Sequence, residues 1–229
     1  MKPYNVLAIA LLGMAAASSV QAASFSYGHK YEDVSKGHTD EVKLSQDFDS
    51  GIGASLKLKF QPTEEESGDA GIAFHDLRWD ETAIGLNYSY DVSDTVSIEP
   101  GFSWARKQDK YKYKPYLKLK YGFAPNWELS SRYRYEITDY AYKETRHKNR
   151  FDAGLSRKFD DLKVSYTYTY YRGDSELFDN KKNDYQQEVE FQYKVTKRFS
   201  PFVSFTNKSV SDDSDQRQTE FEVGMKYKI

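Results

Sequence analysis

Basic side chains recur at alternate positions in two neighbouring segments of the chain. The first segment carries Lys112, Lys114, Lys118 and Lys120, and the second carries Arg132 and Arg134. Lysine presents a mobile point charge, whereas the planar fork of arginine holds a carboxylate through two hydrogen bonds. Such cations, repeated at strand spacing, predict a surface that binds anions at several adjacent sites and passes them onward.

The segments that position these cations are predicted to be β-strands. Hydrophobicity alternates with period two from Ser24 to Ile229, and no stretch of helical length repeats with a period of about 3.6 residues. Several of these segments match the roughly 9 to 11 residues of a tilted strand that crosses a bilayer. We expect twelve strands, near residues 24–33, 41–49, 52–61, 81–92, 95–106, 111–123, 126–138, 149–159, 162–172, 184–195, 199–208 and 218–229.

The connections between the strands are of two kinds. Those after even-numbered strands are tight turns, such as Ser93-Asp94 and Asp160-Asp161. Those after odd-numbered strands are mostly longer and polar: 34–40, 62–80, 107–110, 139–148, 173–183 and 209–217. Short turns on one side and longer loops on the other are typical of outer-membrane barrels. We therefore predict an all-β fold, a 12-stranded antiparallel transmembrane β-barrel with short periplasmic turns and longer extracellular loops.

The apolar register of each strand sorts its side chains by position. In the segment 111–123, Leu117 and Leu119 lie in the middle, with Tyr113 and Phe123 towards the ends. Aliphatic residues in the middle and rings at the ends match a strand whose outer face meets hydrocarbon and then two interfaces. A soluble lipocalin-like barrel with its apolar face turned inward is the alternative, but it gives no reason for this sorting.

The opposite register would line a lumen, where cations outnumber carboxylates although the whole chain has a net charge of −2. In a ring of twelve strands, the cations named above would stand opposite a second group from the first three strands and the last. This group is Lys30, Lys43, Lys57, Lys59, Lys226 and Lys228. We predict two basic tracks that face each other, concentrate anions and carry them through. The alternative is a general diffusion porin whose cations pair with lumen glutamates.

The start of the chain is predicted to be a signal peptide. Lys2 precedes an apolar stretch, and Val20-Gln21-Ala22 supplies small residues where a signal peptidase reads. A membrane anchor is the weaker alternative because the apolar stretch is short. We expect residues 1–22 to be cleaved and residues 23–229 to form a single barrel in the outer membrane of a Gram-negative bacterium. The last strand alternates to the carboxyl end, as recognition by the barrel assembly machinery requires. The other predicted partners are outer-membrane lipids.

Several short motifs resemble those of the oligogalacturonate-specific porin family (KdgM type). They are Ile98-Glu99-Pro100-Gly101-Phe102, Tyr113-Lys114-Pro115-Tyr116-Leu117-Lys118, Arg132-Tyr133-Arg134-Tyr135 and Arg217-Gln218-Thr219 followed by Val223-Gly224. The resemblance runs in order over the mature chain. It implies a monomeric twelve-stranded barrel that takes up acidic oligosaccharides passively, most often oligogalacturonates, past basic residues. Sialic acid and alginate oligomers are alternative cargoes.

Other chemistries find little support in the residues. The absence of cysteine excludes a disulfide scaffold and a cysteine nucleophile. The four histidines, His29, His38, His75 and His147, are expected in the lipid-facing register or in loops, so no catalytic residues, cofactors or metal site are predicted. The slight negative charge argues against nucleic-acid binding. A purely structural or adhesive barrel would not need so many inward cations.

Overall fold

The computed structural model describes residues 20–65 and 68–229, which form one antiparallel sheet. Residues 1–19 of the predicted signal peptide lie outside the described residues, so its cleavage stays a prediction. The strands are β1 Val20–Glu32, β2 His38–Phe48, β3 Ile52–Pro62, β4 Leu77–Tyr88, β5 Tyr90–Asp91, β6 Val96–Arg106, β7 Lys110–Ala124, β8 Trp127–Tyr140, β9 Arg146–Phe159, β10 Leu162–Gly173, β11 Asn183–Tyr193, β12 Phe199–Ser209 and β13 Arg217–Lys228.

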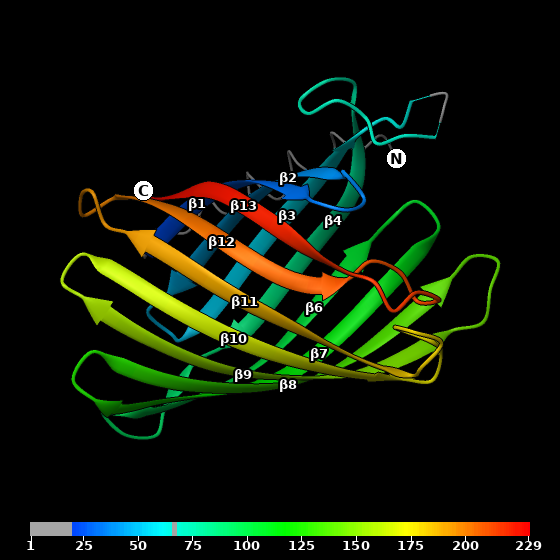
Figure 1. Cartoon of the computed structure of the whole chain (residues 1–229). Coiled ribbons are helices and arrows are strands. Elements are labelled where there is room, and N and C mark those ends of the chain that lie inside the picture. Colours follow the sequence, from blue (N-terminus) through cyan, green and yellow to red (C-terminus); the bar gives the residue numbers. More distant parts are fainter. Residues whose placement is uncertain (1–19, 66–67) are drawn as a thin grey trace.

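The sheet closes on itself into a barrel (Figure 1). Each strand pairs with its neighbours in the sequence, and β1 pairs with β13 from Ser24 opposite Lys228 to Glu32 opposite Glu220. β4 and β5 both pair with β6 in the same register and are interrupted at Ser89, whose amide donates to the carbonyl of Gly51. The two form one span, which confirms the twelve-stranded ring.

The two ends of the barrel differ as predicted. Turns at 49–51, 92–95, 125–126, 160–161 and 194–198 lie at one end. The carboxyl terminus lies at this same end in Figure 1, and the Ile229 amide donates to the Ala23 carbonyl. The other end carries the mostly longer loops, including 63–65 with 68–76, 141–145, 174–182 and 210–216. By the usual orientation of such barrels, the short-turn end is periplasmic and the loop end extracellular.

Apolar side chains point outward and charged ones inward. On β7, Leu117 is 52% exposed, whereas the neighbouring Lys118 is only partly exposed. Leu86 on β4 is likewise exposed at 55%. This is the reverse of a soluble barrel, and it suits strands whose outer face contacts lipid. The alternating register therefore gives the sidedness that the sequence predicts.

Rings gather on the outer surface near the barrel ends. Near the short turns, Phe123 lies 6.0 Å from Trp127 between ring centroids. Towards the loops, Trp104 lies 5.9 Å from Tyr111. Amphipathic rings favour the interfaces of a membrane, so these groups are located where aromatic belts occur.

The interior is polar. Among the described residues, the buried apolar side chains are Leu56, Pro62, Ala83, Ala105 and Phe202, whereas more of the buried residues are polar or charged. No helix within residues 20–65 and 68–229 is long and apolar enough to span a membrane. The closed hydrogen-bond ladder, together with the outward apolar face, holds this fold.

Candidate functional site

A cavity of about 440 Å³ lies inside the barrel between β2, β3 and β4 on one side and β6, β7 and β8 on the other. Both groups of predicted cations contribute to its lining. Its basic side chains are Lys43, Lys57, Lys114, Lys118, Arg132 and Arg134. The ring of strands thus brings together residues that are far apart in the sequence, and the cavity is a candidate anion-binding site.

The β7 lysines have few close partners. No carboxylate among the described residues lies within ion-pair distance of Lys112, Lys114 or Lys118. For Lys112 and Lys114 the reason is that β6 presents the small residues Ala105 and Ser103 opposite them. Lys118 lies opposite Glu99, but that carboxylate is paired with Lys120 instead. These ammonium groups are therefore available to a bound anion.

Several carboxylates nevertheless act on the β7 cations at longer range, including Glu136 on Lys112 and Lys114 and Glu128 on Lys118. Glu99 of β6 lies 3.6 Å from the Lys120 ammonium. Glu81, a buried residue of β4, interacts electrostatically with Lys112 and Lys114, and also with Lys57 and Lys59 of β3. Sequence analysis did not single out Glu81, although its place in the lumen register of β4 was a usable signal. It moderates the cationic field between the two groups.

The β8 arginines are held by acids on neighbouring positions. Arg132 Nε lies 2.6 Å from Asp152 Oδ2, and Arg150 Nε lies 2.8 Å from Asp152 Oδ1. The Thr169 hydroxyl also donates to Asp152 at 2.7 Å. Arg150 was missing from the predicted site, although it faces Arg134 across the β8–β9 ladder.

Arg134 is less completely satisfied than Arg132. Its nearest carboxylate oxygen, in Glu136, is 3.8 Å from Nη1, and its Nε is buried without a hydrogen-bond partner among the described residues. A buried donor without an acceptor costs free energy, which an anionic ligand would recover. Together, Arg132, Arg134 and Arg150 form a fixed cationic group beside the mobile lysines.

Tyr116 lies against these arginines inside the cavity. Its ring centroid is 5.9 Å from the Arg132 guanidinium carbon and 5.7 Å from that of Arg134. Its hydroxyl donates to Glu99 at 3.0 Å. Gly101 lies opposite on β6, and a Cβ there would overlap the Tyr116 ring. Glycine at this position therefore lets the ring lie flat beside the two guanidinium groups, which cation–π attraction favours.

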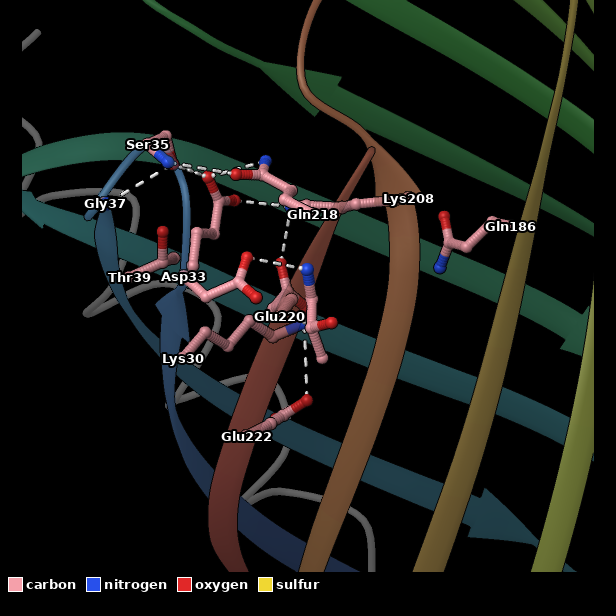
Figure 2. A network of polar contacts seen from close by, with 12 residues as sticks. Lys30, Asp33, Ser35, Gly37, Thr39, Gln186, Lys208, Gln218, Glu220 and Glu222 are labelled. Atoms are coloured by element: carbon pink, nitrogen blue, oxygen red, sulfur yellow. Dashed lines mark hydrogen bonds and ion pairs between the residues drawn. The ribbon is translucent and has the colours of Figure 1, made fainter. Parts of the chain in front are cut away.

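The second group of cations is mostly neutralised. Figure 2 shows Lys30 between Glu220 and Glu222, at 3.1 and 3.3 Å. In the same network Lys208 binds Glu220 at 2.6 Å (Figure 2). Lys208 also contacts Glu32. Acidic residues on β13 and β1 thus neutralise the lysines in this part of the barrel wall.

The other members of this group divide between paired and unpaired lysines. Lys57 and Lys59 share Glu41 at 3.6 and 3.5 Å, and Lys226 lies 3.1 Å from Glu190. Within the described chain, Lys43 and Lys228 have no ion pair. Lys228 lies away from the central cavity, at the short-turn end. The two predicted tracks are therefore unequal, with the less neutralised cations on β7.

Two of the four histidines are placed differently from the expectation. His38 begins β2 and His147 lies on β9, so neither is in a loop. His29 Nε2 lies 3.2 Å from His38 Nδ1, and its Nδ1 lies 3.0 Å from Asp40. The cluster includes no serine or cysteine, and no metal-binding group of three ligands occurs among residues 20–65 and 68–229.

Comparisons with known proteins give relatives of this chain and solved structures with a similar fold. The family model described as oligogalacturonate-specific porin protein (KdgM) matches residues 16–229. The oligogalacturonate-specific porin KdgM of Dickeya dadantii (strain 3937) is 30% identical over 237 residues, covering 96% of this chain and 98% of that protein. The N-acetylneuraminic acid outer membrane channel protein NanC of Escherichia coli (strain K12) is 20% identical over 243 residues, covering 100% of each. A solved structure of the KdgM porin in complex with disordered oligogalacturonate is similar with a TM-score of 0.68 and 25% identity, covering 89% of this chain and 98% of that one.

Proposed function

The chain belongs to the family of oligogalacturonate-specific porins (KdgM), and from this membership we propose that it takes up acidic oligosaccharides, most readily oligogalacturonates, along the basic residues of β7 and β8. As a member of this family it is a porin of the Gram-negative outer membrane. The family consists of channels and not of enzymes. Passage is passive and needs no cofactor, and the channel selects for anions.

The observation that carries this proposal is the row of β7 lysines without close carboxylates, beside a fixed arginine group. Side chains two residues apart on one face of a strand are separated by about 7 Å. Lys112 and Lys114 are therefore about 7 Å apart, and Lys118 lies about 13 Å beyond Lys114, so the three offer successive sites rather than one deep site. A carboxylated chain would move from one lysine to the next without being trapped, because each lysine binds a carboxylate with only moderate affinity.

The arginine group contributes orientation. Since Asp152 binds the Nε of Arg132, the outer nitrogens of that guanidinium remain free for a cargo carboxylate. Arg134 gains a partner for its buried Nε when an anion is bound. Planar guanidinium groups recognise carboxylates through paired hydrogen bonds, which favours sugar acids over neutral sugars.

A general diffusion porin is the second candidate. It is favoured by the pairing of Lys30, Lys57, Lys59 and Lys226 with carboxylates, which leaves a transverse field instead of a second free basic track. The NanC relative adds sialic acids, and alginate oligomers share the same carboxylate chemistry. A general porin would also be blocked by neutral oligosaccharides, whereas a channel for any of these sugar acids would be blocked mainly by acidic ones.

The deciding experiment uses the purified protein in planar bilayers. A salt gradient should give a reversal potential that favours chloride over potassium. Oligogalacturonate should block the current saturably, and neutral maltooligosaccharides much less. Alginate oligomers and N-acetylneuraminic acid, added separately, rank the cargoes. Equal block by neutral and acidic oligosaccharides would support the general porin instead.

A double variant links that block to the arginine group. Arg132→Ser with Arg134→Ser should raise the half-blocking concentration of oligogalacturonate by about tenfold or more, since each charged hydrogen bond contributes about 1.5–3 kcal/mol. Arg78→Ser with Arg146→Ser removes the same charge near the loops and serves as the control. An unchanged block in the first variant would show that Arg132 and Arg134 are scaffolding.

The remaining proposed partners follow from the outer surface. The exposed apolar band contacts outer-membrane lipids, and the barrel works as a monomer. The barrel assembly machinery would recognise the alternating apolar residues at the end of the chain. These are exposed and comprise Phe221, Val223, Met225 and Tyr227 of β13, followed by Ile229. Chemical cross-linking in native membranes tests the monomeric state.

A further inference from the structure

A second cavity lies at the short-turn end of the barrel. It measures about 320 Å³ and is formed by the ends of β9 to β13 with the turns at 160–161 and 194–198. Its lining includes five lysines, which we call the exit cluster: Lys158, Lys163, Lys194, Lys197 and Lys228. The cluster is separate from the central cavity, whose basic residues lie on β2, β3, β7 and β8.

The backbone fixes these lysines close to one another. Lys158 and Lys163 are directly opposite across the β9–β10 hairpin. The Lys194 amide donates to the Asp161 carbonyl at 2.8 Å, and the Lys228 amide donates to the Arg198 carbonyl at 2.8 Å. The hydrogen-bond ladder therefore sets the spacing of the cluster.

The cavity has an excess of positive charge. None of its five ammonium groups forms an ion pair with any residue that the structure describes, although Asp160 and Asp161 also line the cavity. Like charges directly opposite on paired strands are destabilising. The Lys158–Lys163 pairing thus weakens the hairpin, and such a cost is recovered when an anion binds between the two side chains.

The opposite side of the same mouth has another character. A cavity of about 530 Å³ there is lined by Asp91, Asp94 and Glu128 together with Lys120. An anion that leaves the lower end of β7 meets these carboxylates on its own side of the barrel. The charge distribution therefore directs it across the mouth towards β9–β13.

We propose that the exit cluster is a second binding site, which holds the carboxylates of acidic oligosaccharides at the periplasmic mouth. The proposal rests on the proposed function, and it adds a path that crosses the barrel obliquely. Cargo passes from the β7 lysines to the β9–β13 side before release. A chain several sugar units long contacts both sites at once, and it therefore binds more tightly than a single unit.

The test is the sidedness of block. Lys158→Gln, Lys163→Gln and Lys194→Gln are combined, and Lys143→Gln, Lys181→Gln and Lys182→Gln form a control with the same charge change in the loops. Oligogalacturonate is added to one side of a planar bilayer at a time. The orientation of each inserted channel is read by streptavidin on a biotinylated Tyr142→Cys, because this loop residue is 95% exposed and the chain contains no cysteine.

The triple variant should raise the half-blocking concentration from the short-turn side by about tenfold, as expected for lost charged hydrogen bonds, and from the loop side by about twofold or less. The control should leave the value from the short-turn side unchanged. If the triple variant is still blocked normally from the short-turn side, or if block weakens equally from both sides, the exit cluster is not a binding site. The proposed function of the central cavity would be unaffected by that result. If the unaltered protein is blocked from neither side, the proposed function fails, and the role of the cluster fails with it. Lys163→Gln alone gives the same comparison, with a smaller shift, should the triple variant not fold.

Discussion

Asp152 Oδ2 accepts a hydrogen bond from Arg132 Nε at 2.6 Å, and this contact fixes the arginine on the lumen wall. Because the same carboxylate also binds Arg150 and Thr169, it supports three strands at one point. Asp152 is buried, so the contact is shielded from water. Two of the three arginines of the cationic group, Arg132 and Arg150, therefore depend on one acid.

Asp152→Asn is expected to lower the free energy of unfolding by about 2 kcal/mol, because Arg132 and Arg150 lose their shared counter-ion. Urea unfolding of the protein in lipid vesicles measures this change. Asp94→Asn, which removes an exposed turn carboxylate, is the control and should change stability little. An Asp152→Asn variant as stable as the parent would mean that the two guanidinium groups are held by other contacts.

The lysines of β7 and β3 should respond in opposite ways to the same substitution. Lys114→Gln with Lys118→Gln removes unpaired cations and should raise the half-blocking concentration of oligogalacturonate by about tenfold, with little loss of stability. Lys57→Gln with Lys59→Gln leaves Glu41 unpaired and should cost about 1 kcal/mol of stability, with a smaller effect on block. Bilayer recordings and urea unfolding of both variants give the comparison. Similar effects of the two pairs on block would contradict the inequality of the tracks.

Gly101→Ala should displace the Tyr116 ring from the arginines. Loss of this cation–π contact is expected to weaken block by oligogalacturonate about threefold, because each such contact contributes about 0.5–1 kcal/mol. Gly122→Ala is the matched control, since its nearest neighbours would lie 3.9 Å from the added Cβ. If both glycine variants behave alike, Tyr116 does not position Arg132 and Arg134.

A charge on the outer face should be far more costly than one in the lumen. Leu117→Lys is expected to lower the free energy of unfolding in lipid by about 2–4 kcal/mol, as for lysines near the bilayer midplane. Ser45→Lys places the same side chain in the central cavity and should have an effect below about 1 kcal/mol. Equal costs for the two variants would indicate that Leu117 does not face lipid.

The strands and their sidedness follow from the sequence because the side-chain period of a strand is two. A register error by one residue would exchange the lipid face with the lumen face, so the pattern of Leu117 and Lys118 leaves a single solution. The break between β4 and β5 was not predicted. It arises at Ser89, whose amide turns to the Gly51 carbonyl, and alternation alone contains no sign of that contact.

The charge balance of the lumen was harder to predict than its position. Lys57 and Lys114 look equivalent in the sequence, because both alternate with apolar residues. They differ only in their neighbours across the ladder, where Glu41 is within reach of Lys57 and Ser103 lies opposite Lys114. Such partners depend on strand register and side-chain reach, which the pattern of one strand does not contain.

The scarcity of buried apolar side chains inside the barrel has a consequence for how this architecture diversifies. Since the scaffold does not rest on a packed interior, lumen residues can be exchanged one at a time without collapse of the whole. A few substitutions on the wall can therefore change which anions the lumen holds while the barrel stays folded.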